Sequence, residues 1–461
     1  MTTAVDVNAL LVPSIGTYKS QELQFNSTNF EHSQPRSFTI VPDGGLTTAT
    51  VPVSSDHETK FMIPQGCYNF GKSNLRFDFK SNEAKDDAKT FWIREDLLPF
   101  ISVHLRTQTG QVDICNLMGV DHYHRIVSKA ETPIDKFLTM SFTDALKPCD
   151  KEAKDNLVGI TTETGSRNYI EPEYYDIAEA KAAHSTFYRM VRFEDVFKNH
   201  FLGMDKMLYF PEALELSIRW QAASHWGIVP ATKTDATGAA DNAGTISLSN
   251  LSLIMKRESD AAVIASLTES VLRAPPGNPF VINVPDVTYI KLPGAVGTDV
   301  SVTFQLGAPH GKRIKKIFAI PINDTESKGT RYDSGNIGGA KVGRYQTLID
   351  GNPIQPNAIP VSATSLGDWF AHRDKLSGTA LSNFKIYRRN WFICDDFSGQ
   401  TEDNKVMNTG EHNVVTGHPV NIGSKYELIS TNAAAVQWYF YVVGQKTLRI
   451  APAHLGGIGF Q

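Results

Sequence analysis

Strand-like segments of this 461-residue chain fall into two successive groups, at about 1–265 and 280–461. A run of breaker residues at 274–279, Ala-Pro-Pro-Gly-Asn-Pro, separates the two groups. Each group ends on a long alternating or apolar run, 246–255 in the first and 435–443 in the second. Because the same scheme occurs twice, we expect two similar β-domains in tandem, which suggests a building block rather than a catalyst.

The composition supports this organisation. At 461 residues the chain exceeds the size of one ordinary hydrophobic core, which favours two large domains. Hydrophobic residues make up 41% and aromatic residues 10%, enough for the cores between facing sheets. The 34 glycines and 23 prolines are spread between strand-like runs, as expected where many turns connect short strands. The composition therefore favours an all-β fold.

Alternation of apolar and polar residues marks the strands of the first group most clearly at 75–79 and 101–105. Further strands are predicted at 37–41, 60–63, 112–117, 136–142, 206–210 and 213–220. Helical composition occurs at 178–183, and 191–203 is expected to form a short amphipathic helix that ends at Gly203. Polar stretches at 151–167 and 231–245 predict long surface loops.

The second group repeats the scheme, with one helix expected at 366–381. Its predicted strands are 281–284, 287–292, 300–306, 314–321, 344–348, 391–397, 414–422, 427–430, 435–443 and 448–450. About eight strands and one internal helix per group is the content of a jelly roll, in which eight strands form two facing sheets. We therefore predict an all-β fold of two tandem eight-stranded jelly rolls, with short helices in the connecting loops.

The predicted domain boundaries follow from the same pattern. They are an N-terminal arm at 1–30, a first jelly roll at 31–273, a linker at 274–280, a second jelly roll at 281–450 and a C-terminal tail at 451–461. The arm and the Gly-rich tail are suited to lying over a neighbouring subunit and becoming ordered on contact.

Charge and cysteine usage exclude several classes of protein. The net charge of −4 argues against a basic nucleic-acid-binding protein. Four widely spaced cysteines without a CxxC pair indicate neither a disulfide scaffold nor a zinc ribbon, and favour a reducing compartment. The N-terminus lacks the pattern of a signal peptide, and no apolar run approaches the ~18 residues of a membrane span. We expect no membrane insertion.

Several segments resemble one known family. They are 192–197 through 203–209, 214–219, 315–320, 350–356 and 391–397, in which phenylalanines, a glycine and apolar strands follow in a shared order. In this respect the chain resembles the double jelly-roll major capsid proteins of double-stranded DNA viruses, especially the polinton, adintovirus and virophage-like members of the PRD1–adenovirus lineage.

The resemblance implies a structural protein of an icosahedral capsid. It implies a homotrimer that forms a pseudo-hexagonal capsomer and contacts neighbouring capsomers, penton proteins and minor capsid proteins. The loops at 151–167 and 231–245 would then be candidates for the outer tower. The chain would be located in the virion after synthesis in the host-cell cytoplasm.

Histidines and paired acids are the first candidates for chemistry. His122 and His124 form an HxH pair, which in a strand would place both imidazoles on one face. A cupin-like metal site also needs a carboxylate a few residues after this pair. Glu131 is too far from the pair in sequence to supply it. We expect surface or interface histidines. A glycosidase would need two carboxylates at a set separation. The acid pairs are Glu171 with Glu173 and Asp395 with Asp396, which we expect to be solvated.

Four further runs have a composition that is typical of either a site or a simple structural element. Residues 335–341 are Gly-rich but lack phosphate-loop spacing and predict a loop. The basic run at 312–316 could make weak contact with DNA inside a shell, but its alternation favours the start of a half-exposed strand. Residues 455–459 match the L-x-G-x-G preference of adenovirus-like maturation proteases, which a flexible tail also explains. The aromatic run at 438–441 predicts sheet core or trimer contact.

No catalytic, cofactor-binding or metal-ligating residue is predicted, and we do not expect an enzyme. The sequence is also compatible with two alternatives to a capsid protein. One is a two-domain β-sandwich that binds carbohydrate or cleaves glycosides. The other is a trimeric viral spike.

Overall fold

The computed structural model describes most of the strand-forming part of the chain. The described residues are 35–82, 92–93, 98–128, 130–133, 186–229, 240–272, 280–293, 300–306, 313–323, 342–349, 351–353, 356–360, 379, 392–396, 412–413, 420–428, 436–451 and 457–460. The predicted arm at 1–30, the strand at 136–142, the loop at 151–167 and the helix at 178–183 lie outside these ranges, as do Glu171, Glu173 and residues 335–341. Of the predicted helix at 366–381, only Thr379 is described.

The first half of the chain forms two facing antiparallel sheets. One has the order β1-β13-β4-β8, with β2 added to β13 and β9 added to β4; the other has the order β3-β10-β6-β7. The strands are β1 (Pro35–Ile40), β2 (Ala49–Val51), β3 (His57–Ile63), β4 (Gly66–Ser81), β6 (Phe100–Thr107), β7 (Asp113–Met118), β8 (Phe187–Arg192), β9 (Met207–Phe210), β10 (Leu214–Trp220) and β13 (Ile246–Glu258). A small sheet of β5 (Trp92–Ile93), β11 (Gly227–Val229) and β12 (Ala240–Asp241) lies beside them.

The second half repeats this arrangement. Its sheets have the orders β14-β23-β16-β20, with β21 and β24 added, and β15-β22-β17-β18, with β19 added. The strands are β14 (Phe280–Pro293), β15 (Val300–Leu306), β16 (Arg313–Asn323), β17 (Val342–Ile349), β18 (Asn352–Pro353), β19 (Ile359–Pro360), β20 (Ile393–Asp396), β21 (His412–Asn413), β22 (Val420–Leu428), β23 (Val436–Ile450) and β24 (Ile458–Phe460).

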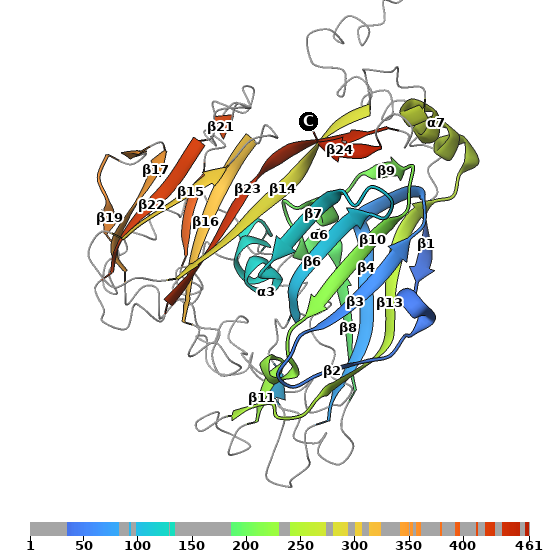
Figure 1. The fold of residues 1–461 in the computed structure, drawn as a ribbon, viewed down its shortest axis with the longest axis horizontal. Coiled ribbons are helices and arrows are strands. Elements are labelled where there is room, and N and C mark those ends of the chain that lie inside the picture. The colour runs from blue at the N-terminus through green and yellow to red at the C-terminus, as the bar shows by residue number, and fades with distance from the viewer. Residues whose placement is uncertain are drawn as a thin grey trace, which may run out of the picture.

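Both halves have the same strand topology. If the eight main strands of each half are counted in chain order, the sheets read 1-8-3-6 and 2-7-4-5 in both cases. Eight antiparallel strands in two facing sheets with long crossovers are a jelly roll. The predicted all-β fold of two tandem jelly rolls is therefore confirmed, and Figure 1 shows the two units side by side.

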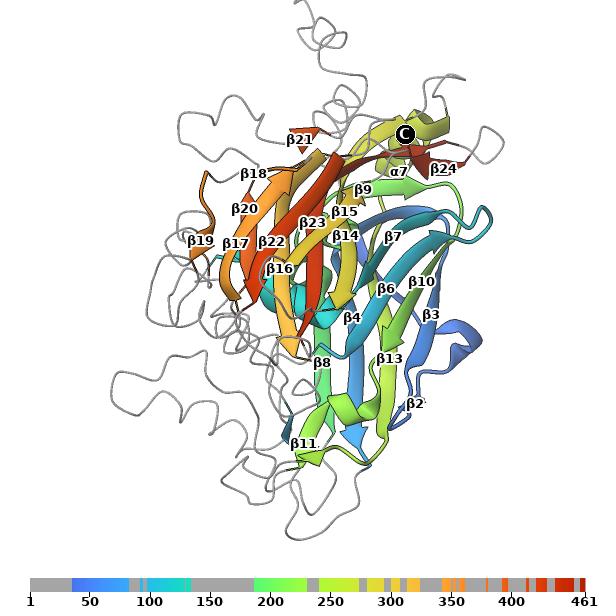
Figure 2. The same ribbon diagram turned by 60° about the vertical axis from the view of Figure 1, so that its left-hand side comes forward.

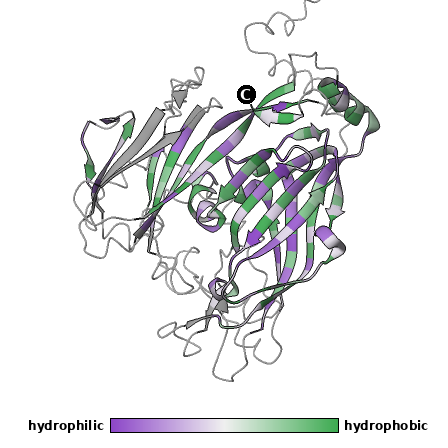
Figure 3. Cartoon of the chain, in the orientation of Figure 1, coloured by the Kyte–Doolittle hydropathy of each residue, from purple (hydrophilic) through white to green (hydrophobic). Residues whose placement is uncertain are grey.

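Hydrophobic alternation explains why these segments are strands. Along β4, Leu75, Phe77 and Phe79 are buried between the sheets, whereas the residues between them reach the surface. Figure 3 shows the resulting alternation of hydrophobic and hydrophilic residues along the strands of the first jelly roll. Trp220 and Trp226 complete this core, with Trp220 packed edge-on against Phe77 at a ring distance of 4.9 Å.

The helices of the described residues are short and lie at the ends of strands. They are η2 (Asp43–Gly45), α3 (Val120–His122), the π-helical turn η3 (Tyr123–Ser128), α6 (Phe193–Val196), η5 (Phe201–Gly203), η6 (Ala223–His225) and α7 (Ala261–Leu272). The predicted helix at 191–203 is wrong in extent. Residues up to Arg192 belong to β8, the helix ends where Phe197 leaves the helical conformation, and Asn199, with a φ of 57°, lies in the turn before η5.

Three strands replace pairs of predicted strands. One of them is β22, which runs without a break from the predicted strand 414–422 into the predicted strand 427–430. The predicted strands 281–284 and 287–292 are one strand, β14, because Pro285 lies in an edge strand, where a missing N–H is tolerated. The predicted strands 435–443 and 448–450 are likewise one strand, β23, which pairs through Gly444 with both β14 and β16.

Helix α7 and residues 240–245 also differ from the sequence prediction. No helix was expected at 261–272, which closes the first jelly roll with Val263 and Leu267 packed on Cys67. The predicted surface loop at 231–245 is wrong at its end, because the amide of Asn242 is buried and donates to the carbonyls of Ala223 and Gly244.

Candidate functional site: the interface between the jelly rolls

The two jelly rolls share one continuous hydrophobic core cluster. On the side of the first unit, the contact is formed by the end of β7 and by the helical turn α3–η3, which we call the corner. On the side of the second unit, it is formed by the strands β14, β23 and β16. Figure 2, turned by 60° from Figure 1, shows that β14 still lies next to β7. Several buried polar side chains lie at this interface, among them His122, Asp286 and Lys446, and it is therefore the candidate functional site.

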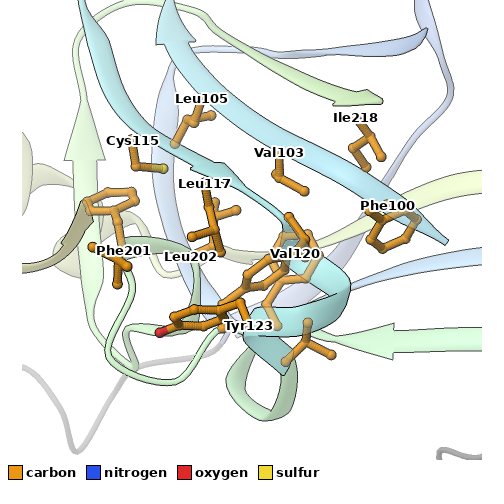
Figure 4. Close-up of a cluster of buried hydrophobic side chains, with 14 of the residues drawn as sticks. Phe100, Val103, Leu105, Cys115, Leu117, Val120, Tyr123, Phe201, Leu202 and Ile218 are labelled. Atoms are coloured by element: carbon orange, nitrogen blue, oxygen red, sulfur yellow. The ribbon is translucent and has the colours of Figure 1, made fainter. Parts of the chain in front are cut away.

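The corner is built by a reversal of the chain after β7. Gly119 adopts the left-handed conformation with a φ of 61°, which turns the chain into α3. Val120 and Tyr123 then point into the first jelly roll, beside Leu117 and Leu202 (Figure 4). The hydroxyl of Tyr123 donates to the carbonyl of Lys198. The corner is thus held to the core and to the chain after α6.

Tyrosines of the second jelly roll cover this corner. The hydroxyl of Tyr441 donates to the carbonyl of Gly119 over 2.7 Å, and its ring packs edge-on against Tyr123 at 5.4 Å. The ring of Tyr439 lies 4.7 Å from that of His122. Tyr289 on β14 completes the cluster, 5.5 Å from Tyr441. Burial raises the pKa of Tyr441 well above its usual value, so its hydroxyl is a donor at all ordinary pH values.

Two ion pairs cross or border the interface. The ammonium of Lys446 lies 2.9 Å from Asp286, with the two side chains only 10% and 9% exposed. The same ammonium donates to the carbonyl of Ile114 on β7 over 2.7 Å and lies 4.1 Å from the ring centre of Phe460. Lys446 therefore connects β23 with β14, β7 and β24.

The second pair joins Lys316 on β16 to Glu131, which follows the corner, at 2.6 Å. Lys316 is the last residue of the basic run predicted at 312–316, and its side chain is turned toward the first jelly roll. Its charge is neutralised there by Glu131, so this residue does not belong to a basic surface.

Burial changes the acid–base properties of two neighbouring groups. Burial lowers the pKa of His200 to about 3, and the Nδ1 atom of this ring accepts a hydrogen bond from the Leu202 N–H over 3.4 Å. Burial raises the pKa of the Cys115 thiol to about 12. At neutral pH His200 is therefore a neutral and weakly basic imidazole, and Cys115 is a thiol and not the reactive thiolate.

The HxH pair lies in a helical turn instead of a strand, so the predicted strand geometry is wrong. His122 ends α3 and His124 lies in η3, and both side chains are buried. Gly119 starts the turn, and packing of Val120 and Tyr123 into the core favours it. The contact of His122 with Tyr439 places this histidine between the two jelly rolls of the chain.

The acid pair of β20 differs from the prediction of solvated acids. Asp395 is buried and accepts a hydrogen bond from the hydroxyl of Thr347 on β17, which connects the two sheets of the second jelly roll. The prediction is wrong for Asp395 because its register places it on the inner face of β20, opposite Ile317.

The aromatic run and the tail have defined positions. Trp438 and Phe440 point into the second jelly roll and stack at 6.3 Å, whereas Tyr439 and Tyr441 face the first, so the run is sheet core and interface. The tail, expected to lie over a neighbour, instead pairs with its own chain at Ile458–Phe460, because β24 extends the edge of β23 beyond the end of β16.

Sequence reasoning missed Lys446, Asp286, Gly119 and His200. The sequence contains one signal for Lys446 and Asp286, because these charged residues interrupt the apolar runs of β23 and β14, two strands that pair with each other. The cross-strand partners of Lys446 and Asp286 are Val284 and Gly444. For His200 the sequence carries no comparable signal, because its burial depends on β14 from the other half.

A row of polar side chains on the outer face of β10, β6 and β7 has the composition of a catalytic triad. His104 lies opposite Ser217 on β10 and bonds Asp113 at 2.7 Å. The hydroxyl of Ser217, however, donates to the carboxylate of Glu58. The row therefore lacks the contact between nucleophile and base that hydrolysis requires.

The described residues contain no group of three or more His, Cys, Asp or Glu side chains that could hold a metal ion. In the same residues, no helix has the length and hydrophobicity needed to cross a membrane.

Comparison with known proteins gives matches at the level of structure. No protein-family model matches the sequence, and no curated protein matches it significantly. Among solved structures, the chain is similar to PBCV-1 VP54, fitted into a reconstruction of the virophage Sputnik, with a TM-score of 0.50 and 9% identity over 94% of this chain and 98% of that one.

Two further matches are the mavirus major capsid protein and the STIV MCP. The first has a TM-score of 0.42 and 10% identity over 95% of this chain and 94% of that one. The second has a TM-score of 0.40 and 11% identity over 89% and 96%. Strand order and the similarity to VP54 together show that this chain has the double jelly-roll fold of viral major capsid proteins.

Proposed function

We propose that this chain is the major capsid protein of an icosahedral DNA virus and forms homotrimeric, pseudo-hexagonal capsomers. One observation carries the proposal. Two jelly rolls of identical strand order dock side by side through a contact in which the corner of one meets a sheet face of the other. Three such chains in a ring would present six similar units, the number that a hexagonal tile needs.

The chemistry of the interface supports a structural role. Two of its buried polar contacts join residues within the chain, namely the pair of Lys446 with Asp286 and the hydrogen bond from Tyr441 to Gly119. Neighbours with this fold are structural capsid proteins. No specific observation favours the carbohydrate-active alternative or the spike.

A capsid function also implies partners and a location for this chain. The partners are other copies of the chain, neighbouring capsomers, and penton and minor capsid proteins, with weak contact to DNA at 312–315. The location is the virion after synthesis in the host-cell cytoplasm. Mass spectrometry of purified virions tests this part, since the chain should be the most abundant protein.

Light scattering coupled to gel filtration, followed by electron microscopy, tests the main proposal. We expect three chains per particle and a pseudo-hexagonal outline. A monomer that binds glycans would contradict the proposal and favour the carbohydrate-binding alternative.

A further inference from the structure

The inner face of the first jelly roll changes character at one end of the sheet that contains β1, β13 and β4. Along this face, apolar side chains of β1 and β13 lie opposite each other, in the pairs Ile40 with Leu253 and Phe38 with Met255. The next pair in the same register is Arg36 with Arg257, and Arg257 is also the partner of Tyr68 on β4. We call Arg36, Arg257 and Tyr68 the arginine row. Figure 1 shows α7 and β9, which adjoin the row in sequence and pairing, at this end of the jelly roll.

The two arginines of the row carry charge that no described carboxylate neutralises. Arg36 and Arg257 are direct cross-strand partners, and like charges in such positions repel each other. In the part of the chain that the structure describes, neither guanidinium forms an ion pair. The carboxylate of Glu258, next in sequence, accepts from the N–H groups of Ser259 and Asp260. The row is therefore doubly positive.

Aromatic rings and a glycine hold Arg257 in position. Its guanidinium carbon lies 5.4 Å from the ring centre of Phe38 and 6.0 Å from that of Tyr68. A Cβ atom at Gly66 would lie 3.3 Å from the Nε atom of Arg257 and 3.2 Å from the Tyr68 ring, so the glycine leaves room for the arginine. Contacts with rings use the face of a guanidinium, whereas its N–H donors lie in its plane. Arg257 is thus oriented before it binds a ligand.

Tyr68 adds a further donor to the row. Its side chain is fully buried, and its hydroxyl has no hydrogen-bond partner among the described residues. Burial raises the pKa of this hydroxyl, and the nearby charge of Arg257 lowers it only in part, so the group keeps its proton at neutral pH. A buried O–H group without an acceptor is unfavourable, and an anionic ligand would supply the acceptor.

On this basis we infer that the arginine row is a binding site for a phosphate-type oxyanion, such as inorganic phosphate or a phosphate monoester. The terminal oxygens of a phosphate can accept from two guanidinium groups and a hydroxyl at once, whereas a carboxylate has only two oxygens. Binding would offset the repulsion between Arg36 and Arg257 and fix the edge strand β1 to β13. The inference is independent of the capsid function proposed above.

Titration of the full-length chain with inorganic phosphate at constant ionic strength tests the inference. We expect calorimetry to detect binding, and the unfolding temperature to rise with phosphate, because a ligand of the folded state stabilises it. Arg257→Gln and Arg36→Gln should each weaken binding by about tenfold or more, through the loss of charge-assisted hydrogen bonds. No binding of phosphate to the unmodified chain would overturn the inference.

Arg76→Gln is the matched control. Arg76 also lies over a tyrosine ring, 5.2 Å from the centre of Tyr188, but on the outer face of the same sheet and opposite Ser252. We expect the phosphate affinity of this variant to equal that of the unmodified chain. Equal weakening by Arg76→Gln and Arg257→Gln would assign the binding to general surface charge and refute the site. Thermal unfolding without phosphate verifies folding, and Arg36→Gln, at an exposed position, keeps the test valid if Arg257→Gln does not fold.

Two competitors test the class of ligand. Neither acetate nor a short DNA duplex should displace phosphate. Acetate offers too few oxygens, and the row lies on the inner face of the sheet, away from a duplex backbone. Displacement by acetate would contradict the preference for phosphate. Displacement by the duplex that is lost in Arg36→Gln would reassign the site to nucleic acid and refute the inference as stated.

Discussion

Lys446 shows at the residue scale how one side chain can hold several strands. Its ammonium meets a carboxylate on β14, a carbonyl on β7 and an aromatic ring on β24. A buried cation is tolerated only when its charge and its donors are satisfied, and these three contacts satisfy them. Gly119 has the complementary role, since the absence of a side chain lets the Tyr441 hydroxyl approach.

Replacing Lys446 should destabilise the chain strongly. Lys446→Met removes the cation from Asp286 in a buried site, for which a loss of about 3–5 kcal/mol in the free energy of unfolding is expected. The double variant Lys446→Met/Asp286→Asn should recover part of this loss, because it removes the uncompensated charge. Urea denaturation measures both. Equal stability of the single variant and the unmodified chain would show that the pair contributes nothing.

A methyl group at Gly119 should be poorly tolerated. Its Cβ would lie 2.5 Å from the Tyr441 hydroxyl, and the φ of 61° disfavours any L-residue. We expect Gly119→Ala to lower the free energy of unfolding by about 2–4 kcal/mol, from backbone strain and a lost hydrogen bond. Gly44→Ala is the matched control. Gly44 has a φ of 79° but open space around its Cβ position, so only the strain of about 1–2 kcal/mol should remain in urea denaturation.

His200 should make the stability depend on pH. Its pKa is 6.5 in the unfolded chain and about 3 in the folded one, where Asp286 and Lys446 are the charged groups nearby. Between these values the unfolded chain binds more protons, so stability is complete above pH 6.5 and falls by about 1.4 kcal/mol per unit as the pH decreases toward 3.

The variant His200→Gln isolates this contribution, because glutamine can still accept the Leu202 N–H but does not titrate. Urea denaturation at pH 7, 5.5 and 4.5 should give a smaller pH dependence for the variant than for the unmodified chain. Parallel pH profiles would exclude His200 as the source.

At the scale of elements, α7 closes the first jelly roll and leads toward the second. Its first turn is capped by Asp260, whose carboxylate accepts from the N–H groups of Ala262 and Val263 at 2.8 and 3.1 Å. Glu258 accepts in the same way from Ser259 and Asp260, which fixes the turn between β13 and the helix. The helix is thus set by its cap as well as by the packing of Val263 and Leu267 on Cys67.

Removal of this cap should weaken the helix. Asp260→Ala leaves two N–H groups without their acceptor and should cost about 1 kcal/mol in the free energy of unfolding. Asp260→Asn keeps an acceptor oxygen and should retain most of the stability. Thermal unfolding compares the two, and equal losses for both would assign the effect to charge instead of capping.

At the scale of the whole molecule, the two jelly rolls depend on each other. The outer face of β23 carries Tyr439 and Tyr441, which are buried and pack against His122 and Tyr123 in the corner of the first unit. Separation would expose this aromatic face together with the pair of Lys446 and Asp286. The interface is therefore obligate in character, and the two units should behave as one cooperative structure.

Calorimetry of the full-length chain tests this coupling. We expect a single unfolding transition whose calorimetric and van't Hoff enthalpies agree. The variant Tyr441→Ala should weaken the coupling and separate the second jelly roll as an earlier transition. Two well-resolved transitions in the unmodified chain would refute the coupling.

How much of this structure could be predicted depends on how far apart in sequence the contacting residues lie. Strands such as residues 75–79 and 214–220 were predictable, because alternation between a core face and an outer face is a local pattern. The helical turn at His122 was not, since it follows from Gly119 and from tertiary packing of the corner. The merging of two predicted strands into β14 likewise depended on its position at a sheet edge.

By itself, then, the sequence determined the periodicity of the strands, their division into two groups and the aromatic material for the cores. Only the tertiary structure decided which face of β23 meets the other jelly roll, that Lys446 binds Asp286 and the carbonyl of Ile114, and that His200 is buried. The reason is physical. Alternation is set by near neighbours along the chain, whereas these contacts join residues that are far apart in sequence and exist only once both sandwiches have formed.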